Sequence, residues 1–263
     1  MLGTGPHSRE AAMTQRMTDP VYRTILLFDI EQFGRRDNVE QAYLRRMLYD
    51  VVDATLLDAG VAETSRLRAD RGDSVMELID TQSSVPALAK ALLTETPALL
   101  HAKNRLIAES TRMRLRIVLA AGYVAVDELG GWVGRDLNHA VRLLDCDPLR
   151  KALKERAEDW VLCASDGIYQ GVVSDGPLGV RPEDFHRITV ETKEGPTIAW
   201  LHGAPSSPTP DTPASDTDSP TGDTPSGLRD TTHVEGDVYG PTGGRNSGGL
   251  HYNFDSLRRG ERE

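Results

Sequence analysis

The chain has 263 residues, and its 30 Lys and Arg against 40 Asp and Glu give a formal charge of −10 at pH 7. This acidic balance argues against nucleic acid as a partner, because a phosphate backbone binds basic surfaces, and no apolar run approaches the ~18 residues of a membrane span. The two cysteines form no CxxC pair, which argues against a disulfide scaffold or a zinc module and predicts a cytoplasmic protein.

Residues 1–20 are polar and aperiodic and contain no apolar segment of a secretory signal, which predicts a flexible N-terminus. A folded region is predicted over residues 21–203. Its first half predicts, in chain order, a buried strand at 22–30, an amphipathic helix through 44–56, two strands joined by a turn at 71–73, and a helix over 85–106 that is kinked or broken near Pro97.

The second half of the region continues the alternation of strands and helices. It predicts a strand over 113–119, a turn at Gly122, a returning strand over 123–126, helices through 137–144 and 149–157, a strand over 160–164, and a final hairpin of 188–192 and 197–202. This order predicts an α+β fold with helices over one face of a mostly antiparallel sheet, related to the split βαβ arrangement.

The composition changes abruptly after the folded region. Residues 204–230 are rich in Pro, Ser and Thr, and almost no apolar side chain there could offset the entropy cost of ordering, which predicts a disordered linker. Over residues 231–254, apolar residues at even spacings flank a Gly/Asn-rich stretch. This pattern predicts two short strands around an arch, stabilised by stacking on copies of itself, or alternatively a disordered Gly-rich end. Residues 255–263 form a charged C-terminal end.

Two acids in the first half of the region are candidate metal ligands. Asp29 lies near the end of the first predicted strand, and Asp73 lies in the hairpin turn. If the two strands are neighbours, both carboxylates meet at one end of the sheet, where they could hold Mg²⁺ or Mn²⁺ with a triphosphate completing the shell. The alternatives are a turn-forming role for Asp73 and a cap or loop role for Asp29.

A second candidate pair lies on the helix through 137–144. Asn138 and Arg142 are four residues apart and therefore share one helix face. An amide and a guanidinium on one face can contact a ribose oxygen and stabilise charge at a phosphorus atom. The alternative is a solvated polar stripe beside the apolar face of the same helix.

Three short motifs in this order resemble the catalytic domain of class III nucleotidyl cyclases over about residues 21–202. The motifs are Phe28-Asp29-Ile30 followed by Phe33, then Gly72-Asp73, and then Gly134, Leu137-Asn138, Ala140 and Arg142-Leu143. The resemblance implies a ferredoxin-like cyclase homology domain, with an antiparallel-dominated sheet and flanking helices. It also implies a homodimer with its active sites in the shared cleft.

The same resemblance implies roles for individual residues. Asp29 and Asp73 would bind two Mg²⁺ or Mn²⁺ ions per site, with help from the backbone of Ile30. Asn138 would orient the ribose, and Arg142 would stabilise the transition state. The reaction would be attack of the ribose 3′-hydroxyl on the α-phosphate of a nucleoside triphosphate, which yields a cyclic nucleotide and pyrophosphate.

The two positions with which the family selects its base depart from the pattern. They are Ala69 and Gly131 here, and neither side chain can hydrogen-bond a base edge. Asp70 and Trp132 stand one place away and could substitute in a shifted register. The resemblance therefore leaves the base unassigned.

The chain looks closer to cyclase-like proteins of filamentous actinobacteria, and its tail is similar to bacterial amyloid signalling motifs related to the RIP homotypic interaction motif. The matching tail residues are Gly236–Gly240, Asn246 and Gly248–Tyr252. Two functions stay open: a homodimeric cyclase, or a catalytically degenerate adaptor that the tail recruits to a like motif in a bacterial immune or conflict system. Asp29, Asp73, Asn138 and Arg142 favour the first function, whereas Ala69 and Gly131 favour the second.

Overall fold

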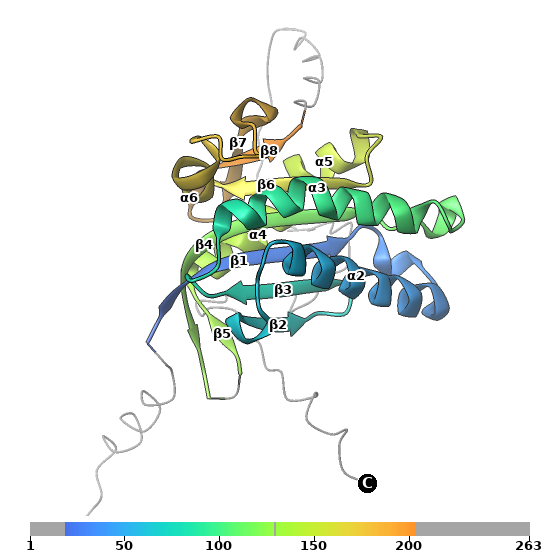
Figure 1. The fold of residues 1–263 in the computed structure, drawn as a ribbon, viewed down its shortest axis with the longest axis horizontal. Helices are drawn as coiled ribbons and strands as arrows, with labels where there is room; N and C mark the ends of the chain where they lie inside the picture. The colour runs from blue at the N-terminus through green and yellow to red at the C-terminus, as the bar shows by residue number, and fades with distance from the viewer. Residues whose placement is uncertain (1–18, 129, 204–263) are drawn as a thin grey trace, which may run out of the picture. The chain divides into compact units, whose positions relative to one another are not determined.

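The computed structural model describes residues 19–128 and 130–203 (Figure 1). The linker predicted over 204–230, the tail motif over 231–254, the end over 255–263 and nearly all of the predicted flexible N-terminus lie outside these residues. None of the described helices combines the length and the apolar composition that a membrane crossing requires.

An eight-stranded sheet forms the centre of the described region, in the order β2-β3-β1-β4-β6-β8-β7, with β5 paired to β4 off this path. Among the strand pairs of the described residues, β4–β6 is parallel and the others are antiparallel. The strands are β1 (Val21–Ile30), β2 (Arg66–Asp70), β3 (Ser74–Ile79), β4 (Leu115–Val126), β5 (Trp132–Val133), β6 (Trp160–Ser165), β7 (Phe185–Thr192) and β8 (Gly195–His202).

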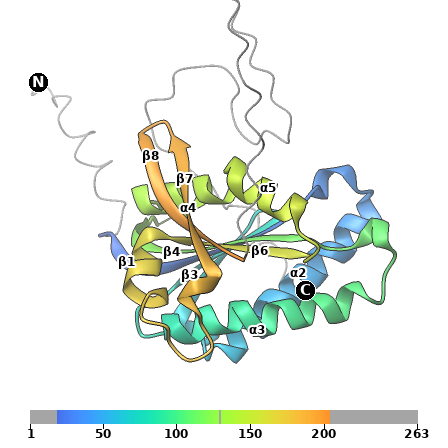
Figure 2. The same cartoon turned by 90° about the horizontal axis from the view of Figure 1, so that it is seen from above.

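Helices cover both faces of this sheet (Figure 2). Helices α2 (Asn38–Asp58) and α3 (Val85–Asn104) pack on one face, and α4 (Arg135–Leu144) and α5 (Asp147–Glu155) pack on the other. The segment from β1 to α3 and on to β4 is a ferredoxin-like unit whose two helices share one face, as the sequence predicts. The prediction of helices on one face alone is wrong, because α4 and α5 bury the second face under an apolar cluster of their own.

In the first half of the folded region, the elements predicted from hydrophobic periodicity are present. Strand β1 is buried on both faces from Thr24 onward, which explains its nearly continuous apolar run. Helix α2 begins with a capping box, in which the Asp37 carboxylate accepts from the N–H groups of Val39 and Glu40 at 2.8 Å. Its predicted apolar positions are buried against the sheet.

Helix α3 continues through Pro97, so of the predicted kink or break the break is wrong. A proline inside a helix removes one backbone hydrogen bond, but tertiary packing holds this helix on both sides of the proline. Leu92 and Leu100 are buried in the core. Thr96, next to the proline, forms a buried hydrogen bond of 2.8 Å with the hydroxyl of Thr55 in α2.

The turn predicted at Gly122 is also wrong, because β4 runs unbroken over Leu115–Val126. The missing side chain permits close packing instead: a Cβ at Gly122 would lie 2.2 Å from the Cβ of Asp136 in α4. A Cβ at Gly134 would lie 2.6 Å from the carbonyl oxygen of Tyr123. These two glycines let the start of α4 lie directly on β4, where Asp136 accepts a hydrogen bond of 2.7 Å from the Tyr123 N–H.

The remaining elements complete the second half. The predicted hairpin exists as β7 and β8, with Gly195 and Pro196 at the start of β8 rather than in the turn. The sequence patterns did not predict β5, nor the short helix α6 (Asp166–Ile168) and the π-helical turn (Tyr169–Val173) that follow β6.

Candidate functional site

Asp29 and Asp73 meet at one end of the sheet. The antiparallel pairing of β1 with β3 places Asp29 opposite Ser74, the residue that follows Asp73. The Ile30 N–H donates a hydrogen bond of 3.0 Å to the Asp73 carbonyl, which joins the end of β1 to the β2–β3 turn. The strand neighbourhood on which the acid-pair hypothesis depends is therefore present.

Asp29 is a buried acid with a cationic partner. Its exposed fraction is 8%, and the β1–β4 register places it directly opposite Arg116. Arg116 Nε donates to the Asp29 Oδ2 at 2.9 Å, and Arg116 Nη2 donates to the same oxygen. Burial raises the pKa of Asp29 to about 7, although Arg116 lowers it, and the negative charge of Asp73 raises it further.

The turn that carries Asp73 has a defined hydrogen-bonded geometry. The Arg71 N–H donates to the Ser74 carbonyl at 2.9 Å, and Gly72 adopts φ of +87°, which favours glycine. The Gly72 N–H also donates to the Asp70 Oδ1 at 2.7 Å, and this contact closes an Asx-type turn. Asp70 forms an ion pair with Arg45 of α2, so its side chain lies on the α2 face of the sheet.

Of the two predicted base-selecting positions, Ala69 lies on the other face of the sheet. Ala69 alternates with Asp70 along β2 and is packed in the apolar cluster under α4 and α5, with an exposed fraction of 3%. Trp132 belongs to the same cluster with an exposed fraction of 4%. Gly131 is held by Asp127, whose carboxylate accepts its N–H at 2.6 Å. The side chains of Ala69 and Trp132 therefore lie on the α4 face of the sheet, whereas that of Asp70 lies on the α2 face.

Helix α4 presents the amide and guanidinium pair. Asn138 is half-buried one turn from the start of the helix, and its N–H donates to the Gly134 carbonyl at 3.1 Å. Arg142 follows one turn later and makes a two-pronged ion pair with Glu194 in the β7–β8 turn, at 2.7 and 2.9 Å. The pKa of Arg142 is raised by these hydrogen bonds.

Within one chain, the contacts divide the four candidate side chains into two groups. Arg116 connects Asp29 to the Leu144 carbonyl at the end of α4, at 3.5 Å, while Asp73 lies beside Asp29. Arg142 is directed to the β7–β8 turn instead. The contacts within one chain therefore link Asp29 and Asp73, whereas Arg142 pairs with Glu194.

The pair formed by Asp29 and Asp73 fits a divalent cation that takes only one or two carboxylate ligands from the protein. Over residues 19–128 and 130–203 there is no cluster of three His, Cys, Asp or Glu side chains able to hold a metal ion. Mg²⁺ is nevertheless commonly held by one or two carboxylates together with substrate phosphates, and it keeps several waters. Asp29, Asp73 and the Ile30 backbone supply hard oxygen donors of this type, with Arg116 as the cation already present beside them.

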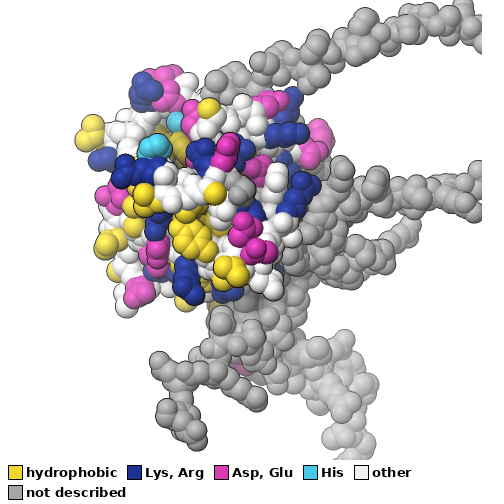
Figure 3. All heavy atoms as spheres, turned by 90° about the vertical axis from the view of Figure 1, so that its right-hand side faces the viewer, with side chains coloured by type: hydrophobic (Ala, Val, Ile, Leu, Met, Phe, Trp, Pro, Cys, Tyr) yellow, Lys and Arg dark blue, Asp and Glu magenta, His cyan; other side chains and the backbone are white. Residues whose placement is uncertain are grey.

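The same end of the sheet carries mixed charge at its surface. Figure 3 views the side of the molecule toward which β1 and β2 run, and basic and acidic side chains are interspersed across its coloured part. With charges of both signs side by side, this coloured part of the surface produces no broad basic field.

Two functional partners could not be predicted from the sequence patterns: Arg116 beside Asp29, and Glu194 beside Arg142. The alternation along β4 placed Arg116 between apolar residues, but only the strand register assigns it to Asp29. Glu194 lies 52 residues from Arg142, in a turn whose position depends on the whole sheet.

The fold has solved counterparts. The chain resembles the guanylyl cyclase Cya2 at 16% identity and a TM-score of 0.51, over 72% of this chain and 95% of that one. It resembles an adenylate/guanylate cyclase/hydrolase from Silicibacter pomeroyi at 17% identity and a TM-score of 0.50, over 72% of this chain and 99% of that one. No protein-family model and no curated protein matches the sequence. The described region therefore has the α+β fold of these cyclase catalytic domains.

Proposed function

We propose that this chain is a class III type nucleotidyl cyclase that works as a homodimer and converts a nucleoside triphosphate into a cyclic nucleotide and pyrophosphate. One observation carries the proposal: the β1–β3 register and the hydrogen bond from the Ile30 N–H to the Asp73 carbonyl bring Asp29 and Asp73 together at one end of a cyclase-fold sheet.

Asp29 and Asp73, with the backbone of Ile30, would hold two Mg²⁺ or Mn²⁺ ions per site. Bound divalent cations neutralise charge on a triphosphate and on the oxygens that attack and leave. Arg116 favours the ionised form of Asp29 against the effect of burial, because it places a guanidinium beside the carboxylate. This ionised form is the one that a cation requires.

Asn138 would orient the ribose, and Arg142 would stabilise negative charge at the α-phosphate. The 3′-hydroxyl would pass its proton to solvent water as its oxygen bonds to the α-phosphorus, and the bond between the α-phosphorus and the oxygen that bridges to the β-phosphate would break to release pyrophosphate. As the resemblance to class III cyclases implies, a second copy would supply the α4 pair to each site. Arg142 must leave Glu194 to act there.

The base is not assigned by this proposal, because neither Ala69 nor Gly131 offers a side-chain hydrogen bond to a base edge. The test therefore supplies ATP, GTP, CTP and UTP separately with Mn²⁺ and detects cyclic monophosphates by mass spectrometry. Asp73→Ala is the matched control. We expect a cyclic product from the wild-type chain that the variant does not form, and equal yields from both proteins would refute the proposal.

A second candidate function is a catalytically degenerate, cyclase-like adaptor. Ala69 and Gly131 favour it, and so do the ion pairs that occupy Asp29 and Arg142. This function predicts triphosphate binding or dimerisation without turnover. Calorimetry with each triphosphate, on protein that yields no cyclic product, separates an adaptor that binds a nucleotide from one that only dimerises.

Under either function, we propose that residues 231–254 act as an amyloid-type signalling motif of the kind found with actinobacterial cyclase-like domains. In-register stacking would pair its backbone with a like motif in another protein. A synthetic peptide of residues 231–254 is expected to form thioflavin-positive fibrils, and a peptide that stays soluble and unstructured would remove this part of the proposal.

A further inference from the structure

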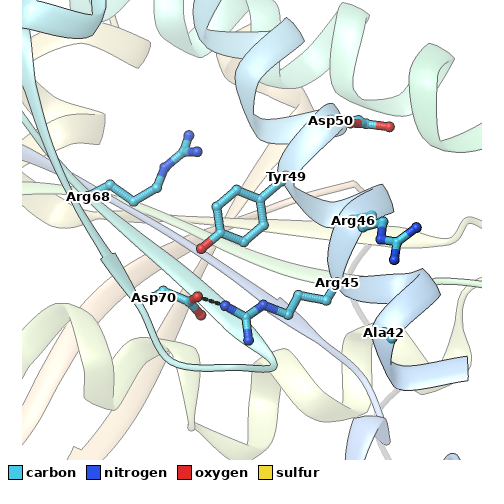
Figure 4. Close-up of a pocket in the computed structure, with 7 residues that line it drawn as sticks. All are labelled: Ala42, Arg45, Arg46, Tyr49, Asp50, Arg68 and Asp70. Atoms are coloured by element: carbon cyan, nitrogen blue, oxygen red, sulfur yellow. Dashed lines mark ion pairs between the residues drawn. The ribbon is translucent and has the colours of Figure 1, made fainter. Parts of the chain in front are cut away.

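The turn that carries Asp73 is connected to α2 through Asp70, the last residue of β2 (Figure 4). One oxygen of the Asp70 carboxylate, Oδ1, accepts the Gly72 N–H at 2.7 Å. The other, Oδ2, forms an ion pair with Arg45 Nη2. A single carboxylate thus bonds the backbone of the turn with one oxygen and a helix side chain with the other.

The ion pair lies beside an open hollow of about 830 Å³ between α2 and β2, lined by Ala42, Arg45, Arg46, Tyr49, Asp50, Arg68 and Asp70. Figure 4 shows Arg45 extending from α2 to Asp70, with the Tyr49 ring between Arg45 and Arg68. The guanidinium carbons of Arg45 and Arg68 lie 5.9 and 5.0 Å from the centre of that ring. Aromatic and guanidinium contacts of this kind restrict the conformations that a long side chain can adopt.

The strand that leads into the turn is anchored on the same face. Arg68 Nε donates to the fully buried Glu77 of β3 at 2.5 Å, and Arg68 Nη2 donates to Asp53 of α2 at 2.5 Å. Asp70 lies two residues further on, and its side chain is 12% exposed whereas that of Arg45 is 45% exposed. The Arg45–Asp70 pair is therefore the point where α2 contacts the strand at the start of the Asp73 turn.

On the other side of the turn, the Asp73 carbonyl accepts the Ile30 N–H at 3.0 Å, next to Asp29. A shift of the turn would change this bond and the separation of the two acids together. We propose that Asp70 and Arg45 are positioning residues for Asp73, which hold the turn from the α2 face so that the Asp73 and Asp29 carboxylates bind a cation jointly. This inference rests on the metal role of Asp73 in the proposed function.

Three variants of the full chain separate the effect of the Gly72 hydrogen bond from that of the Arg45 ion pair. Asp70→Ala removes both the Gly72 hydrogen bond and the ion pair. Asp70→Asn keeps an oxygen that can accept the Gly72 N–H, whereas Arg45→Met removes the ion pair and keeps an apolar side-chain stem. Asp50→Asn is the matched control, because it breaks a comparable α2 ion pair with Lys103 that does not touch the turn.

The first readout is the dissociation constant for Mn²⁺ in the presence of inorganic tripolyphosphate, measured from the free Mn²⁺ signal in electron paramagnetic resonance. Loss of a partner that orients a metal ligand typically weakens binding by about 10- to 100-fold. We expect about tenfold weaker binding for Asp70→Ala, about two- to threefold for Asp70→Asn and Arg45→Met, and wild-type binding for Asp50→Asn. Unchanged binding in Asp70→Ala would overturn the inference.

The second readout needs no metal. The exchange rate of the Ile30 amide reports the hydrogen bond to Asp73, and we expect Asp70→Ala to accelerate it while amides in the centre of β1 stay protected. An unchanged Ile30 rate would overturn the inference as well. Asp73→Ala separates this outcome from a failure of the proposed function: if that variant binds Mn²⁺ like the wild type, the metal role of Asp73 is wrong, and the Ile30 rate alone then decides whether Asp70 positions the turn.

Discussion

Arg116 lies directly across the β1–β4 ladder from Asp29 and donates two hydrogen bonds to a single oxygen of its carboxylate. The pair is nearly buried, with side-chain exposures of 14% for Arg116 and 11% for Asp29. A buried acid beside a fixed guanidinium and close to a second acid is a costly arrangement for stability alone. In the proposed function, this arrangement serves cation and triphosphate binding.

Replacing Arg116 with Met is expected to reduce stability in a pH-dependent way. At pH 8 the wild-type Asp29 is ionised beside Arg116, and the variant must either bury this charge without its partner or take up a proton, because loss of Arg116 raises the pKa of Asp29. Loss of one member of a buried ion pair costs about 3–5 kcal/mol. At pH 5 the loss should be smaller, because a neutral Asp29 needs no counter-charge. Urea unfolding at the two pH values measures this difference, and an equal loss at both would contradict the ionic role of Arg116.

The raised pKa of Asp29 predicts how stability changes with pH. The folded value is about 7 and the ordinary value is 3.8, so between these values the folded chain binds a proton more tightly than the unfolded chain does. This group's contribution to the free energy of unfolding is therefore fully present below about pH 4 and is lost as pH rises through 7.

Asp73→Asn provides the control for this pH dependence. The substitution removes a negative charge that raises the pKa of Asp29. The pH at which the stabilising contribution of Asp29 is lost should therefore be lower in the variant. Carboxyl-carbon NMR of Asp29 measures both titrations. A midpoint near 4 in the wild-type chain would contradict the predicted burial effect.

Gly122→Ala tests the close docking of α4 on β4. The added Cβ would meet the Asp136 side chain at 2.2 Å, so the start of α4 must move away from the strand. We expect overpacking of this kind to lower the free energy of unfolding by about 1–3 kcal/mol. Urea unfolding measures this loss. Gly167→Ala is the control, since a Cβ there meets nothing within 4 Å, and a similar loss in both variants would show that close docking at Gly122 does not limit stability.

Glu194→Gln tests whether the ion pair with Arg142 competes with catalysis. The Glu194 side chain is exposed, so thermal unfolding should not change. Arg142 would be released from its partner in the β7–β8 turn, and turnover should rise by at most about fivefold, because exposed ion pairs are weak. Lower turnover with unchanged stability would mean that Glu194 supports the site instead of competing for Arg142.

Most of the fold could be predicted from hydrophobic periodicity, because β1, α2, α3 and the two hairpins have strong local patterns. The errors arose where tertiary contacts outweigh local signals. Gly122 has the composition of a turn but serves a close contact with Asp136, and Pro97 is tolerated because packing against α2 and the sheet holds α3 on both sides of it.

The candidate site could be predicted only in part. The proximity of Asp29 to Asp73 follows from a hairpin that turns beside the end of β1, which local pattern and motif order together indicate. The partners Arg116 and Glu194 depend on strand register and on the position of a distant turn, which no local pattern contains. The face on which Asp70 lies likewise became clear only from its contact with α2.

In the proposed dimer, the acids of one copy and the α4 pair of another form each site, and mixing two inactive variants distinguishes this arrangement from a site within one chain. Asp73→Ala and Arg142→Ala are each expected to form no cyclic nucleotide with Mn²⁺ and the accepted triphosphate. A mixed dimer has one site with intact acids from one chain and an intact α4 pair from the other. Equal mixing with free exchange should therefore restore about a quarter of the wild-type rate, since half of the dimers are mixed and each has one intact site of two. A mixture that stays inactive, although mass spectrometry detects mixed dimers, would rule out a site shared between two copies.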